Sequence, residues 1–592
     1  MGSLDRIVRY PVKGLAGQPT DTAVLRADHG LAYDRAFAIE TGAAPTVSGW
    51  APRETFFHLA RDSALIEFRA HVDEPASRLR IEPPGSTPID VRLDDAHRND
   101  DMAAAGRALA DVLPVGRAAP RLVMPSDRVW DWPDASLSLI NLDTLEELSQ
   151  RAGRRLDPRR FRANLYVSGL GAWEEFDLIG RRVRLGEATV EVMWPTDRCR
   201  ATTIDPETGD TDLNLPALLA SQVGHMFCGV YLRVVEGGQI ETGAKAEPVE
   251  APRSAPYRAD DDALHWPRRA TVTSIVHEGG DVVSFWLRDP LAFARRTRPG
   301  QHLRIHPTGD VSSALWRCYT ISGIDGDAYR VSVKRDGVVS SLLHDAYKEG
   351  TGLVVTGPFG DVTLDAAQSR PAVFISAGIG LTPTLAMLRG LDDDGRDVRV
   401  VHVDRGEPPA GLWGEVESEL ERLSHASVVR YDTMDGRPHP ATIADVVRGL
   451  VDPTVYVCGP AGFYEDVHDA LVAAEVDPES IRHEVFFSPS TAQRTEPKPP
   501  PEPGPFTVQF GSGDDSRGVW DVERGSLLDV GESLGLPMPS GCRAGVCGTC
   551  ALRVTSGTTS YVNDPVISVP RGATLLCSAV PTSDVTVELP QD

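Results

Sequence analysis

The spacing of four cysteines near the C-terminus constrains the fold of this 592-residue chain more than any other feature. The segment "GCRAGVCGTC" supplies Cys542, Cys547 and Cys550 in the pattern C-x4-C-x2-C, and Cys577 follows in "LLCSA". This is the ligand spacing of a [2Fe–2S] cluster. Small residues fill the positions between the cysteines, so the loop can wrap closely and direct backbone N–H groups at sulfide. The pattern predicts a small domain built around a one-electron carrier.

A zinc site made of the same four cysteines is the alternative. Zinc sites favour two separate C-x2-C pairs, and only one such pair is present. The surrounding block, 506–592, begins with the strand-like segments "FTVQF" and "GVWDVE" and a short helical segment, "SLLDVGESLG". Over its full length this block resembles a plant-type ferredoxin domain, and the resemblance implies a β-grasp fold.

Charge and composition narrow the possible functions of the whole chain. Its net charge of −25 argues against nucleic-acid binding and against docking on anionic membranes. Apolar and charged contents of 41% and 24% are typical of globular proteins, and the length suits about four domains. No apolar run is long enough to span a membrane, and the N-terminal segment lacks the apolar core of a signal peptide. Eight cysteines in so long a chain do not suggest a disulfide framework, so we expect a cytoplasmic protein.

Two segments are predicted to be linkers. The segment 488–505 contains "EPKPPPEPGP", with six prolines in ten residues, and as polyproline II it would span about 55 Å. The segment 246–262, "AEPVEAPRSAPYRADDD", is rich in proline, alanine and charge. Between them, 263–487 begins β-rich and becomes α/β after about residue 366. The N-terminal block, 1–245, alternates short strand-like runs with turns, which predicts a β-rich body.

The first half of the middle block contains two segments that suit a phosphate-bearing ligand. "RCYTIS" (317–322) is predicted to end a strand, and "VKRDGVVSSLLHD" (333–345) is predicted to lead into a helix. We expect Ser340 and Ser341 to cap the N-terminus of that helix. A helix N-terminus with an arginine nearby suits a pyrophosphate.

The second half carries a strand–turn–helix motif. "PAVFISAGIGLTPTLAML" (371–388) predicts a buried strand, a turn containing Gly378 and Gly380, and a helix that starts near Thr382. "VRVVHVD" (398–404) and "TVYVCGP" (454–460) predict further strands of a parallel sheet. Cys458 would end its strand, at the edge where open α/β sheets bind ligands, although it could also be a simple core thiol.

In this order, the two halves resemble the ferredoxin–NADP reductase superfamily, of the type found in oxygenase reductases and flavohaemoglobins. The resemblance implies an antiparallel flavin-binding β-barrel over 263–366 and an α/β nucleotide-binding domain over 367–487. It also implies that Arg317 binds the flavin phosphate, Tyr319 packs on the isoalloxazine, Thr320 approaches N5, and Ser340 binds the pyrophosphate. The implied nicotinamide site consists of Gly378, Gly380, Thr382, Cys458, Gly459 and Pro460.

The identities of the flavin and of the nucleotide are less constrained. Relatives with a C-terminal ferredoxin often use FMN and carry Gly-Gly-Ser before the helix. This chain has Val338-Val339-Ser340 instead, which favours FAD, with FMN as the alternative. Arg405 could accept the 2′-phosphate of NADPH or be a solvated loop charge, so NADH and NADPH both remain open.

The N-terminal block contains basic residues in apolar, strand-like surroundings. Cys199 lies between two arginines in "PTDRCRATT", after the strand-like "ATVEVMW". Buried cations need anionic partners. Internal salt bridges, with Asp34 or Asp197, are one possibility, and an anionic cofactor is the other. The basic and polar residues in question are Lys13 in "YPVKG", Arg35 in "YDRAF", Arg162 and Asn164 in "FRANLYV", and Arg198.

Six segments together resemble the MOSC family, closest to the amidoxime-reducing proteins: "YPVKG", "GLAYDRAF", "FRANLYV", "EEFDLIGRRVRLG", "PTDRCRATTIDPETG" and "CGVYLRVV". The resemblance implies an N-terminal β-barrel domain over 1–95, a MOSC domain over 96–245, and a pyranopterin molybdenum cofactor. Cys199 would be the catalytic thiolate ligand of molybdenum, because a soft thiolate suits this metal and the arginines lower its pKa. Gly14 and Ala163 depart from the family's usual Ser and Pro. The implied residues around the cofactor's phosphate and pterin are Lys13, Arg35, Arg162, Asn164 and Arg198.

The sequence therefore predicts a self-sufficient, multidomain α+β and α/β molybdenum oxidoreductase. Electrons would pass from NADH or NADPH through FAD and the [2Fe–2S] cluster to the molybdenum cofactor, which would reduce a small N-hydroxylated or N-oxide substrate. No obligate redox partner is expected. Three alternatives remain open: a reductase for a partner oxygenase with an inactive MOSC domain, MOSC-linked sulfur transfer, and a dedicated N–O or S–O step in a biosynthetic pathway.

Overall fold

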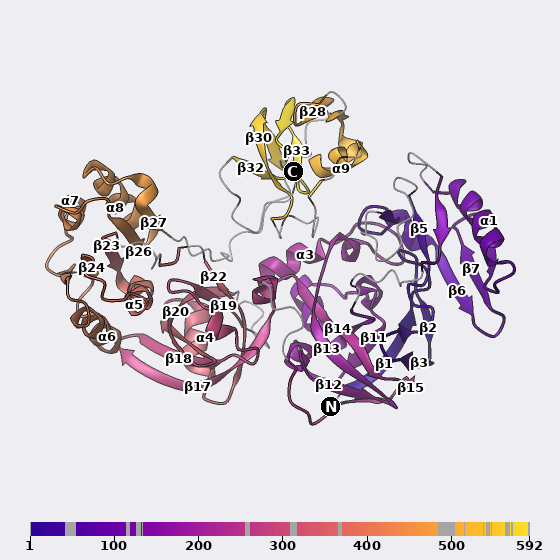
Figure 1. Cartoon of the computed structure of the whole chain (residues 1–592), viewed down its shortest axis with the longest axis horizontal. Helices are drawn as coiled ribbons and strands as arrows, with labels where there is room; N and C mark the ends of the chain where they lie inside the picture. The colour runs from indigo at the N-terminus through magenta and orange to yellow at the C-terminus, as the bar shows by residue number, and fades with distance from the viewer. Residues whose placement is uncertain are drawn as a thin grey trace. The chain divides into compact units, whose positions relative to one another are not determined.

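The computed structural model divides the chain into two compact units, Met1–Tyr257 with Arg494–Asp592, and Arg258–Gln493 (Figure 1). Each unit is described separately below. The residues that the structure describes are 2–41, 55–113, 119–125, 132, 134–254, 261–307, 316–360, 362–364, 370–483, 504–513, 516–534, 536, 538–539, 545, 548–562, 569 and 572–589.

The first unit contains a ring of strands in the order β11-β10-β14-β13-β12-β16-β1, and an additional β1–β11 pairing closes it. The two long central strands are buried along most of their length, because both of their faces are covered. Within the range 1–95, β1 joins this ring, and the rest of the ring comes from 137–248. The strands are β1 (Gly2–Arg9), β10 (Leu137–Asn141), β11 (Leu165–Ser168), β12 (Arg182–Leu185), β13 (Ala188–Asp197), β14 (Phe227–Glu236) and β16 (Lys245–Pro248).

Strand β16 corrects the predicted linker 246–262. Its residues pair with β12 on one side and with β1 on the other. The chain then stays on the same domain, since Val249 N donates to Arg182 O at 2.8 Å and Ser254 N donates to Gly180 O at 2.7 Å. Pairing on two edges outweighs the local proline and alanine content. The predicted linker 488–505 lies outside the described residues, except for its last two positions.

Smaller sheets surround the ring. In β6 and β7 alternate residues are buried, and α1 lies beside that sheet (Figure 1). Ala105 and Leu109 of α1 belong to the same buried hydrophobic cluster as Val72, Leu79 and Ile81. The elements are β2 (Gln18–Thr20), β3 (Thr22–Arg26), β4 (Gly30–Leu31), β5 (Ala38–Glu40), β6 (Arg69–Asp73), β7 (Arg78–Glu82), β8 (Ile89–Arg92), α1 (Arg98–Ala110), β9 (Arg121–Val123), α2 (Leu142–Ala152), α3 (Leu215–Leu218) and β15 (Gly238–Glu241).

The second unit begins with a closed barrel in the order β17-β18-β21-β20-β19-β22. The segment 317–322 opens β20 and does not end a strand as predicted, since Arg317 pairs with Ile305 and Thr320 with His302. Val339 and Leu343 of the helix α4 pack into the barrel core. The elements are β17 (Arg268–Gly279), β18 (Val282–Arg288), β19 (His302–His306), β20 (Arg317–Asp325), β21 (Ala328–Lys334), α4 (Val338–Ala346) and β22 (Gly352–Phe359).

A buried ion pair fastens this barrel. Arg268 Nε donates to both carboxylate oxygens of Asp289 at 2.8 Å. Arg268 Nη2 donates to Tyr329 Oη at 2.9 Å and to Gly357 O at 2.6 Å, and Tyr329 Oη donates to Asp289 Oδ2 at 2.8 Å. Every partner of this buried charge is therefore hydrogen-bonded, and the network joins β17, β21 and β22 to the end of β18.

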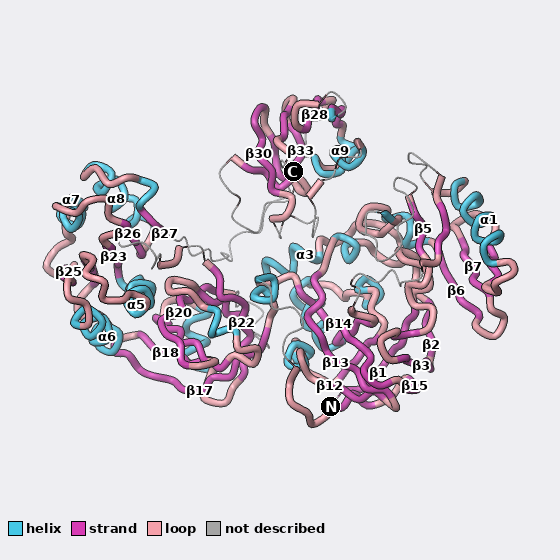
Figure 2. The backbone as a smooth tube through the Cα atoms, in the orientation of Figure 1, coloured by secondary structure: helices cyan, strands magenta, loops and turns pink. Residues whose placement is uncertain are grey.

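A parallel five-stranded sheet follows, in the order β25-β24-β23-β26-β27 (Figure 2). The predicted strand 398–404 matches β24, and Cys458 ends β26 as predicted. The elements are β23 (Ala372–Ala377), α5 (Leu381–Arg389), β24 (Val398–Asp404), α6 (Ala410–Glu421), β25 (Ala426–Asp432), α7 (Pro440–Ala444), β26 (Thr454–Cys458), α8 (Ala461–Ala473) and β27 (Ile481–His483).

The C-terminal block forms a sheet in the order β29-β28-β34-β30-β32, with α9 beside it. A capping box between Ser526 and Asp529 starts α9. Two β-barrels, a parallel α/β sheet and this ferredoxin-like sheet confirm the predicted fold class. The elements are β28 (Phe506–Phe510), β29 (Arg517–Trp520), α9 (Leu527–Ser533), β30 (Ala551–Ser556), β31 (Thr559–Tyr561), β32 (Ala573–Leu575), β33 (Ala579–Pro581) and β34 (Val585–Val587). Within the described ranges, no helix has both the length and the apolar character needed to cross a bilayer.

Candidate functional site

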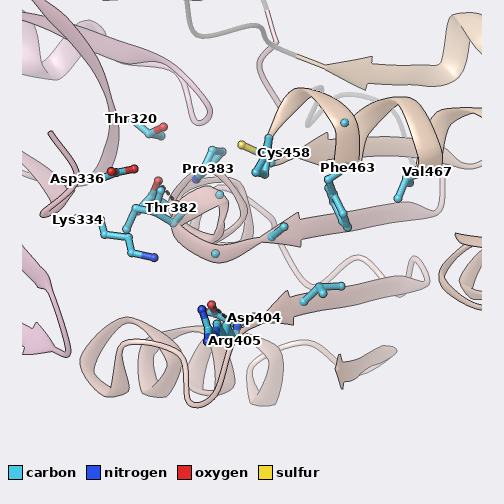
Figure 3. Close-up of a pocket in the computed structure, with 18 of the residues that line it drawn as sticks. Thr320, Lys334, Asp336, Thr382, Pro383, Asp404, Arg405, Cys458, Phe463 and Val467 are labelled. Carbon is cyan, nitrogen blue, oxygen red and sulfur yellow. Dashed lines mark hydrogen bonds between the residues drawn. The ribbon is translucent and has the colours of Figure 1, made fainter. Parts of the chain in front are cut away.

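A cavity of about 1200 Å³ lies in the second unit, between the barrel and the ends of the parallel strands (Figure 3). It brings together all ten residues that the sequence assigned to the flavin and the nicotinamide. Four come from β20 and α4, and six come from the turn after β23, the first turn of α5, the end of β26 and the two residues that follow it. They are Arg317, Tyr319, Thr320, Ser340, Gly378, Gly380, Thr382, Cys458, Gly459 and Pro460.

The barrel side of the cavity suits a flavin. Burial raises the pKa of the Tyr319 phenol, although the positive charge of Arg317 partly offsets this. Tyr319 is therefore neutral and offers an aromatic face. Thr320, which carries a hydroxyl group, is buried beside it. The Arg317 side chain is held by one hydrogen bond, in which Nη1 donates to Trp316 O at 2.9 Å. The cation, the aromatic ring and the buried hydroxyl on one strand suit a ligand that has both a phosphate group and a planar ring system.

Ser340 lies inside its helix and does not cap it, so the predicted caps at Ser340 and Ser341 are wrong. Gly337 takes the N-cap position with a φ of 97°, a conformation that glycine adopts at little cost. Ser340 Oγ accepts a hydrogen bond from Asp336 N at 2.7 Å and donates one to Gly337 O at 3.1 Å. The residue still lines the cavity, and its hydroxyl holds the turn that leads into α4.

The α/β side depends on close approach between a glycine turn and a strand end. A β-carbon placed on Gly380 would lie 2.9 Å from the carbonyl carbon of Cys458 and 3.3 Å from its Sγ. A β-carbon on Gly459 would lie 2.7 Å from Cδ1 of Phe463. Only glycine fits at either position without displacing its neighbours. The turn therefore packs directly on the end of β26, where Cys458 faces the cavity.

The cavity also has lining residues that the sequence analysis did not assign, namely Lys334, Asp336, Asp404, Arg437 and His439. Figure 3 shows Asp404 and Arg405 together at the end of their strand, whereas Thr320, Lys334 and Asp336 come from the barrel side. Asp404 could have been found from the sequence, because it lies at the C-terminal end of a predicted strand. Arg437 could not, because it lies in a loop that carries no motif.

Cys199 follows β13 and begins a short 3₁₀ helix, Arg200–Thr203, where it is half-buried. Arg198 is buried beside it and donates from Nε at 2.7 Å, and also from Nη2, to Cys228 O. Its Nη1 donates to Phe161 O at 3.1 Å. These bonds use three of its five N–H groups, so Arg198 fixes the loop that carries the thiol.

A second arginine, Arg160, fastens the other end of this loop. Its guanidinium is buried and donates from Nη1 to Thr203 O at 3.2 Å. It forms ion pairs of 2.7 Å with Asp205 and with Asp212. Cys199 therefore lies on a short segment that two buried cations hold in place.

The segments that carry Lys13, Arg35 and Arg162 converge on one another. Arg35 Nη1 contacts Asp34 Oδ2 at 2.7 Å and Asn164 Oδ1 at 3.3 Å, and its Nη2 donates to Arg162 O at 3.0 Å. Lys13 N donates to Phe37 O at 2.8 Å, which aligns its segment with the one after Arg35. The internal salt bridge that the sequence left open therefore exists for Arg35.

Both the nitrogen and the oxygen of the Asn164 side-chain amide form hydrogen bonds. Its Nδ2 donates to Val8 O at 3.1 Å and to Asp34 Oδ1 at 2.9 Å, and its Oδ1 accepts from Ser138 N at 3.1 Å. Asp34 also accepts from Tyr10 N at 2.8 Å. The amide of Asn164 thus joins three segments of the protein.

The backbone conformations and contacts of these residues suit an anionic, polar ligand. Arg35 and Arg162 both take left-handed φ values, 47° and 50°, which are strained for residues with a side chain and cluster at functional sites. Both guanidinium groups lie over the ring of Tyr10, at 4.8 and 4.5 Å. Thr196 Oγ1, three residues before Cys199, is buried without a hydrogen-bond partner among the described residues. Strained cations and an orphaned hydroxyl near a thiol fit a phosphate-bearing cofactor.

A buried carboxylate behind this site was missed by the sequence analysis. Burial raises the pKa of Glu175 to about 7, although hydrogen bonds from Asn141 and Thr144 partly offset this effect. Its Oε1 also accepts from Gly229 N at 3.4 Å. Burial likewise raises the pKa of the neighbouring Cys228 thiol, which makes it an inert core residue.

Two of the four predicted cluster ligands are described in the C-terminal domain. Leu576 N donates to Cys550 O at 3.1 Å, so the segments carrying Cys550 and Cys577 lie side by side. Gly545 N donates to Cys577 Sγ at 3.3 Å. Cys542 and Cys547 lie outside the described residues, and the described part of the chain contains no set of three His, Cys, Asp or Glu side chains arranged for a metal.

Comparisons with known proteins agree with this architecture. The MOSC domain family matches residues 126–247, and the 2Fe-2S iron-sulfur cluster binding domain family matches 515–582. The ferredoxin reductase component of 3-ketosteroid-9-alpha-monooxygenase from Mycobacterium tuberculosis (strain CDC 1551 / Oshkosh) is 30% identical over 324 residues, which are 51% of this chain and 88% of that protein. The flavohemoprotein of Bacillus subtilis (strain 168) is 34% identical over 39% of this chain, and the match covers 62% of that protein.

Among solved structures, phthalate dioxygenase reductase matches with a TM-score of 0.33 and 22% identity, over 55% of this chain and 98% of that chain. The barrel, the parallel sheet and the shared cavity define a modular flavin- and nicotinamide-type reductase. The chain belongs to the family of ferredoxin reductase components of oxygenases, and it carries a MOSC domain in addition.

Proposed function

We propose that the chain is a self-sufficient NAD(P)H-dependent molybdenum oxidoreductase that reduces N-hydroxylated or N-oxide compounds. One observation carries the proposal: a reductase with a complete predicted flavin–nicotinamide cavity shares its chain with a MOSC domain whose half-buried Cys199 lies on a loop fixed by buried arginines. The overall reaction consumes one N-hydroxylated molecule, one NAD(P)H and one proton. It yields the deoxygenated compound, NAD(P)⁺ and water.

Electrons would pass from NAD(P)H through FAD and the [2Fe–2S] cluster to a pyranopterin molybdenum cofactor. When bound, the flavin would supply the change from two-electron to one-electron transfer, the cluster would supply one-electron transfer, and molybdenum would supply the two-electron chemistry needed to deoxygenate the substrate. The protein supplies binding and orientation. On the reductase side, Gly380 lets the nicotinamide approach Cys458, while Tyr319 and Thr320 hold the flavin ring.

On the MOSC side, the residues fall into two roles. Cys199 is the thiolate that would bind molybdenum, and Lys13, Arg35 and Arg162 would neutralise the cofactor's phosphate. The bonds of Arg198 and Asn164 to the protein itself give them positioning roles. Arg198 holds the loop of Cys199, and Asn164 holds the guanidinium of Arg35 through the contact at 3.3 Å.

The test is metal analysis of the purified full chain, followed by anaerobic NADH and NADPH oxidation in the presence of N-hydroxy compounds. The proposal expects molybdenum, flavin and iron in one preparation, and oxidation of one NAD(P)H for each substrate reduced. A preparation that contains flavin and iron but excludes molybdenum after expression with sufficient molybdate would contradict it.

A reductase that serves a separate oxygenase is the second candidate. It is favoured by the similarity to the ferredoxin reductase component of a monooxygenase, since the match covers 88% of that protein. In that case the MOSC domain would be inactive. NAD(P)H-dependent reduction of an artificial acceptor by a molybdenum-free preparation, with no activity on N-hydroxy compounds, would identify this candidate.

We propose a reducing, cytoplasmic location for the protein. The six described cysteines form no disulfide with one another, and three of them are assigned to metal ligation.

A further inference from the structure

One helix connects the flavin side of the cavity to the nicotinamide side. Tyr319 and Thr320 belong to β20 of the barrel, whereas α5 of the parallel-sheet domain begins directly after the glycine turn at Gly380. At its other end α5 finishes with Arg389. Arg389 Nη1 donates to Ser322 O of β20 at 2.6 Å. The helix that starts at the nicotinamide turn is therefore bonded, at its far end, to the strand that carries the flavin residues.

The carbonyl group that accepts this bond belongs to a β-bulge. The register of β20 against β21 shifts between Ile321 and Gly323, so Ser322 is an extra residue in β20. A bulge leaves its extra residue outside the regular ladder, and bulges are common next to active sites. Gly323 contributes space, since a β-carbon there would lie 2.8 Å from Arg389 Nη1. The bulge and the glycine together leave room for the Arg389 side chain on β20.

A glutamate of α6 holds the Arg389 guanidinium in this place. Arg389 Nη2 donates to Glu415 Oε2, and its Nε lies 3.8 Å from Glu419 Oε1. The buried Arg330 of β21 donates to the same Glu415, from Nη1 at 2.8 Å and from Nη2 at 2.6 Å. Arg330 Nη2 also donates to Ser322 O at 3.4 Å. Glu415 therefore bridges one arginine from the barrel and one from the parallel-sheet domain, and both arginines reach the same carbonyl group.

The three charged groups depend on one another. Burial lowers the pKa of Arg389 and the charge of Arg330 lowers it further, whereas the two glutamates raise it. Burial opposes ionisation of Glu415, but its bonds to the two arginines outweigh this and lower its pKa. Loss of the carboxylate would leave two like charges together in a partly buried place. The two arginines and Glu415 therefore act as one unit.

The position of α5 matters for the reaction in the cavity. Flavin reduction moves a hydride, with both of its electrons, from the nicotinamide to the flavin, and NAD(P)H leaves as NAD(P)⁺. The reacting atoms must come within about 3–3.5 Å, and a misplacement of about 1 Å can cost roughly 100-fold in rate. With nine residues, α5 is only about 13 Å long, so a bond at Arg389 restrains the turn at Gly380. Neither Arg389 nor Glu415 is among the described residues that line the cavity.

We infer that Arg389 is a positioning residue for hydride transfer, and that its bonds to Ser322 and Glu415 fix the nicotinamide turn relative to the flavin strand. This inference rests on the flavin–nicotinamide site of the proposed function. Because the side chain touches neither ligand, its effect falls on the rate of the step and not on nucleotide affinity. Arginine suits the role, since its rigid planar fork reaches a carbonyl and a carboxylate at once, whereas a lysine ammonium sits on a flexible stem.

The test is anaerobic stopped-flow reduction of the flavin-loaded full chain by NADH and by NADPH, over a range of nucleotide concentrations. Arg389→Met keeps an unbranched side chain but removes the charge and the hydrogen bonds. Its limiting rate of flavin reduction should fall at least about tenfold, while the half-saturating nucleotide concentration stays within about threefold. The long-wavelength absorbance of the nicotinamide–flavin charge-transfer complex should weaken in parallel. Arg389→Lys, which keeps the charge, should recover part of the rate.

Arg422→Met is the matched control, because Arg422 binds the same end of α5 from within the parallel-sheet domain. Its Nη2 donates to Leu388 O at 2.9 Å and to Leu391 O at 2.7 Å. This variant should keep a limiting rate within about twofold of that of the unaltered chain. Glu415→Gln removes the shared negative charge and should lower the limiting rate in the same direction as Arg389→Met.

An unchanged limiting rate and charge-transfer absorbance in Arg389→Met, or an equal fall in Arg422→Met, would overturn the inference and leave the proposed function intact. Should Arg389→Met fail to retain flavin, the same two measurements on Glu415→Gln decide, and an unchanged result there would overturn the inference. If neither nucleotide reduced the flavin of the unaltered chain, the proposed function would fail, and this inference with it.

Discussion

The carbonyl carbon of Cys458 lies 2.9 Å from the point where a β-carbon would stand on Gly380. The contact joins the turn after β23 to the end of β26, and the obstructing atoms belong to the backbone. Backbone cannot move aside as a flexible side chain can. The shape of the nicotinamide end of the cavity therefore depends on the absence of a side chain at residue 380.

Gly380→Ala should impair nucleotide use without loss of flavin. The added methyl group must displace either the turn or the strand end, so hydride transfer loses its geometry. We expect the rate of flavin reduction by NAD(P)H, measured by anaerobic stopped-flow absorbance, to fall at least about tenfold. Gly414→Ala, at a position in α6 with nothing within 4 Å of the added carbon, should leave the rate unchanged and stabilise the helix slightly. An unimpaired Gly380→Ala variant would mean that the turn is free to move.

Removing the buried charge partner of Arg268 should destabilise the flavin barrel strongly. Asp289→Ala leaves a buried guanidinium without its carboxylate, which costs about 3–5 kcal/mol in unfolding free energy. The exposed pair between Arg295 and Asp327 provides the comparison, since loss of such a pair costs about 0–1 kcal/mol. The measurement is the thermal transition of the flavin-containing unit, followed by release of flavin fluorescence. Equal shifts for Asp289→Ala and Asp327→Ala would contradict the assigned importance of the buried network.

Glu175 should make the stability of the MOSC domain depend on pH. Its pKa is about 7 in the folded protein and 4.5 as the reference value. Between these values the folded form keeps a proton that the unfolded form has lost, so stability falls as pH rises from 4.5 to 7 and changes no further above 7. The contribution over this window is about 3 kcal/mol relative to Glu175→Gln. Denaturant unfolding of both proteins across the window tests this, and parallel pH profiles would show that Glu175 does not titrate there.

Cys199→Ala should separate the two halves of the activity. It removes the proposed molybdenum ligand but leaves the reductase cavity untouched. We expect reduction of N-hydroxy compounds to be lost and NAD(P)H-dependent reduction of ferricyanide to be retained. Cys228→Ala, which alters a buried thiol, should retain both activities. Loss of ferricyanide reduction in Cys199→Ala would indicate damage to the fold or a wrong site assignment.

Cys577→Ala should interrupt the chain of carriers between the flavin and the MOSC domain. Without the fourth cysteine the cluster should be lost, with its visible absorbance and its iron. NAD(P)H should still reduce the flavin, while turnover of N-hydroxy compounds stops. Retention of zinc in place of iron in the unaltered chain would instead support the alternative metal site.

Much of this architecture could be predicted from local patterns. The strand 398–404 and the end of β26 at Cys458 follow from buried β-branched runs bounded by turns, and the glycine turn follows from strand–turn–helix context. The resemblance to the ferredoxin–NADP reductase superfamily, which rests on such segments, implied ten site residues, and all ten line one cavity. The local patterns worked because each signal is contained in a few adjacent residues.

Other features depend on contacts between distant segments. Composition assigned 246–248 to a linker, but pairing with two strands far away in sequence makes them part of a sheet. A serine pattern suggested a cap at Ser340, but Gly337 occupies that position because its φ of 97° suits it. The engagement of Asn164 by Val8 and Asp34 also could not be predicted, since those partners lie about 130 or more residues away in the chain.

Molybdenum K-edge X-ray absorption of the full chain, before and after anaerobic addition of NADH or NADPH, tests the central claim most directly. The account predicts a sulfur shell around molybdenum that loses one ligand in Cys199→Ala, and an absorption edge that moves to lower energy when the nucleotide reduces the protein. A sulfur shell that is the same in both proteins, or an edge that stays unmoved while the flavin is fully reduced, would contradict it.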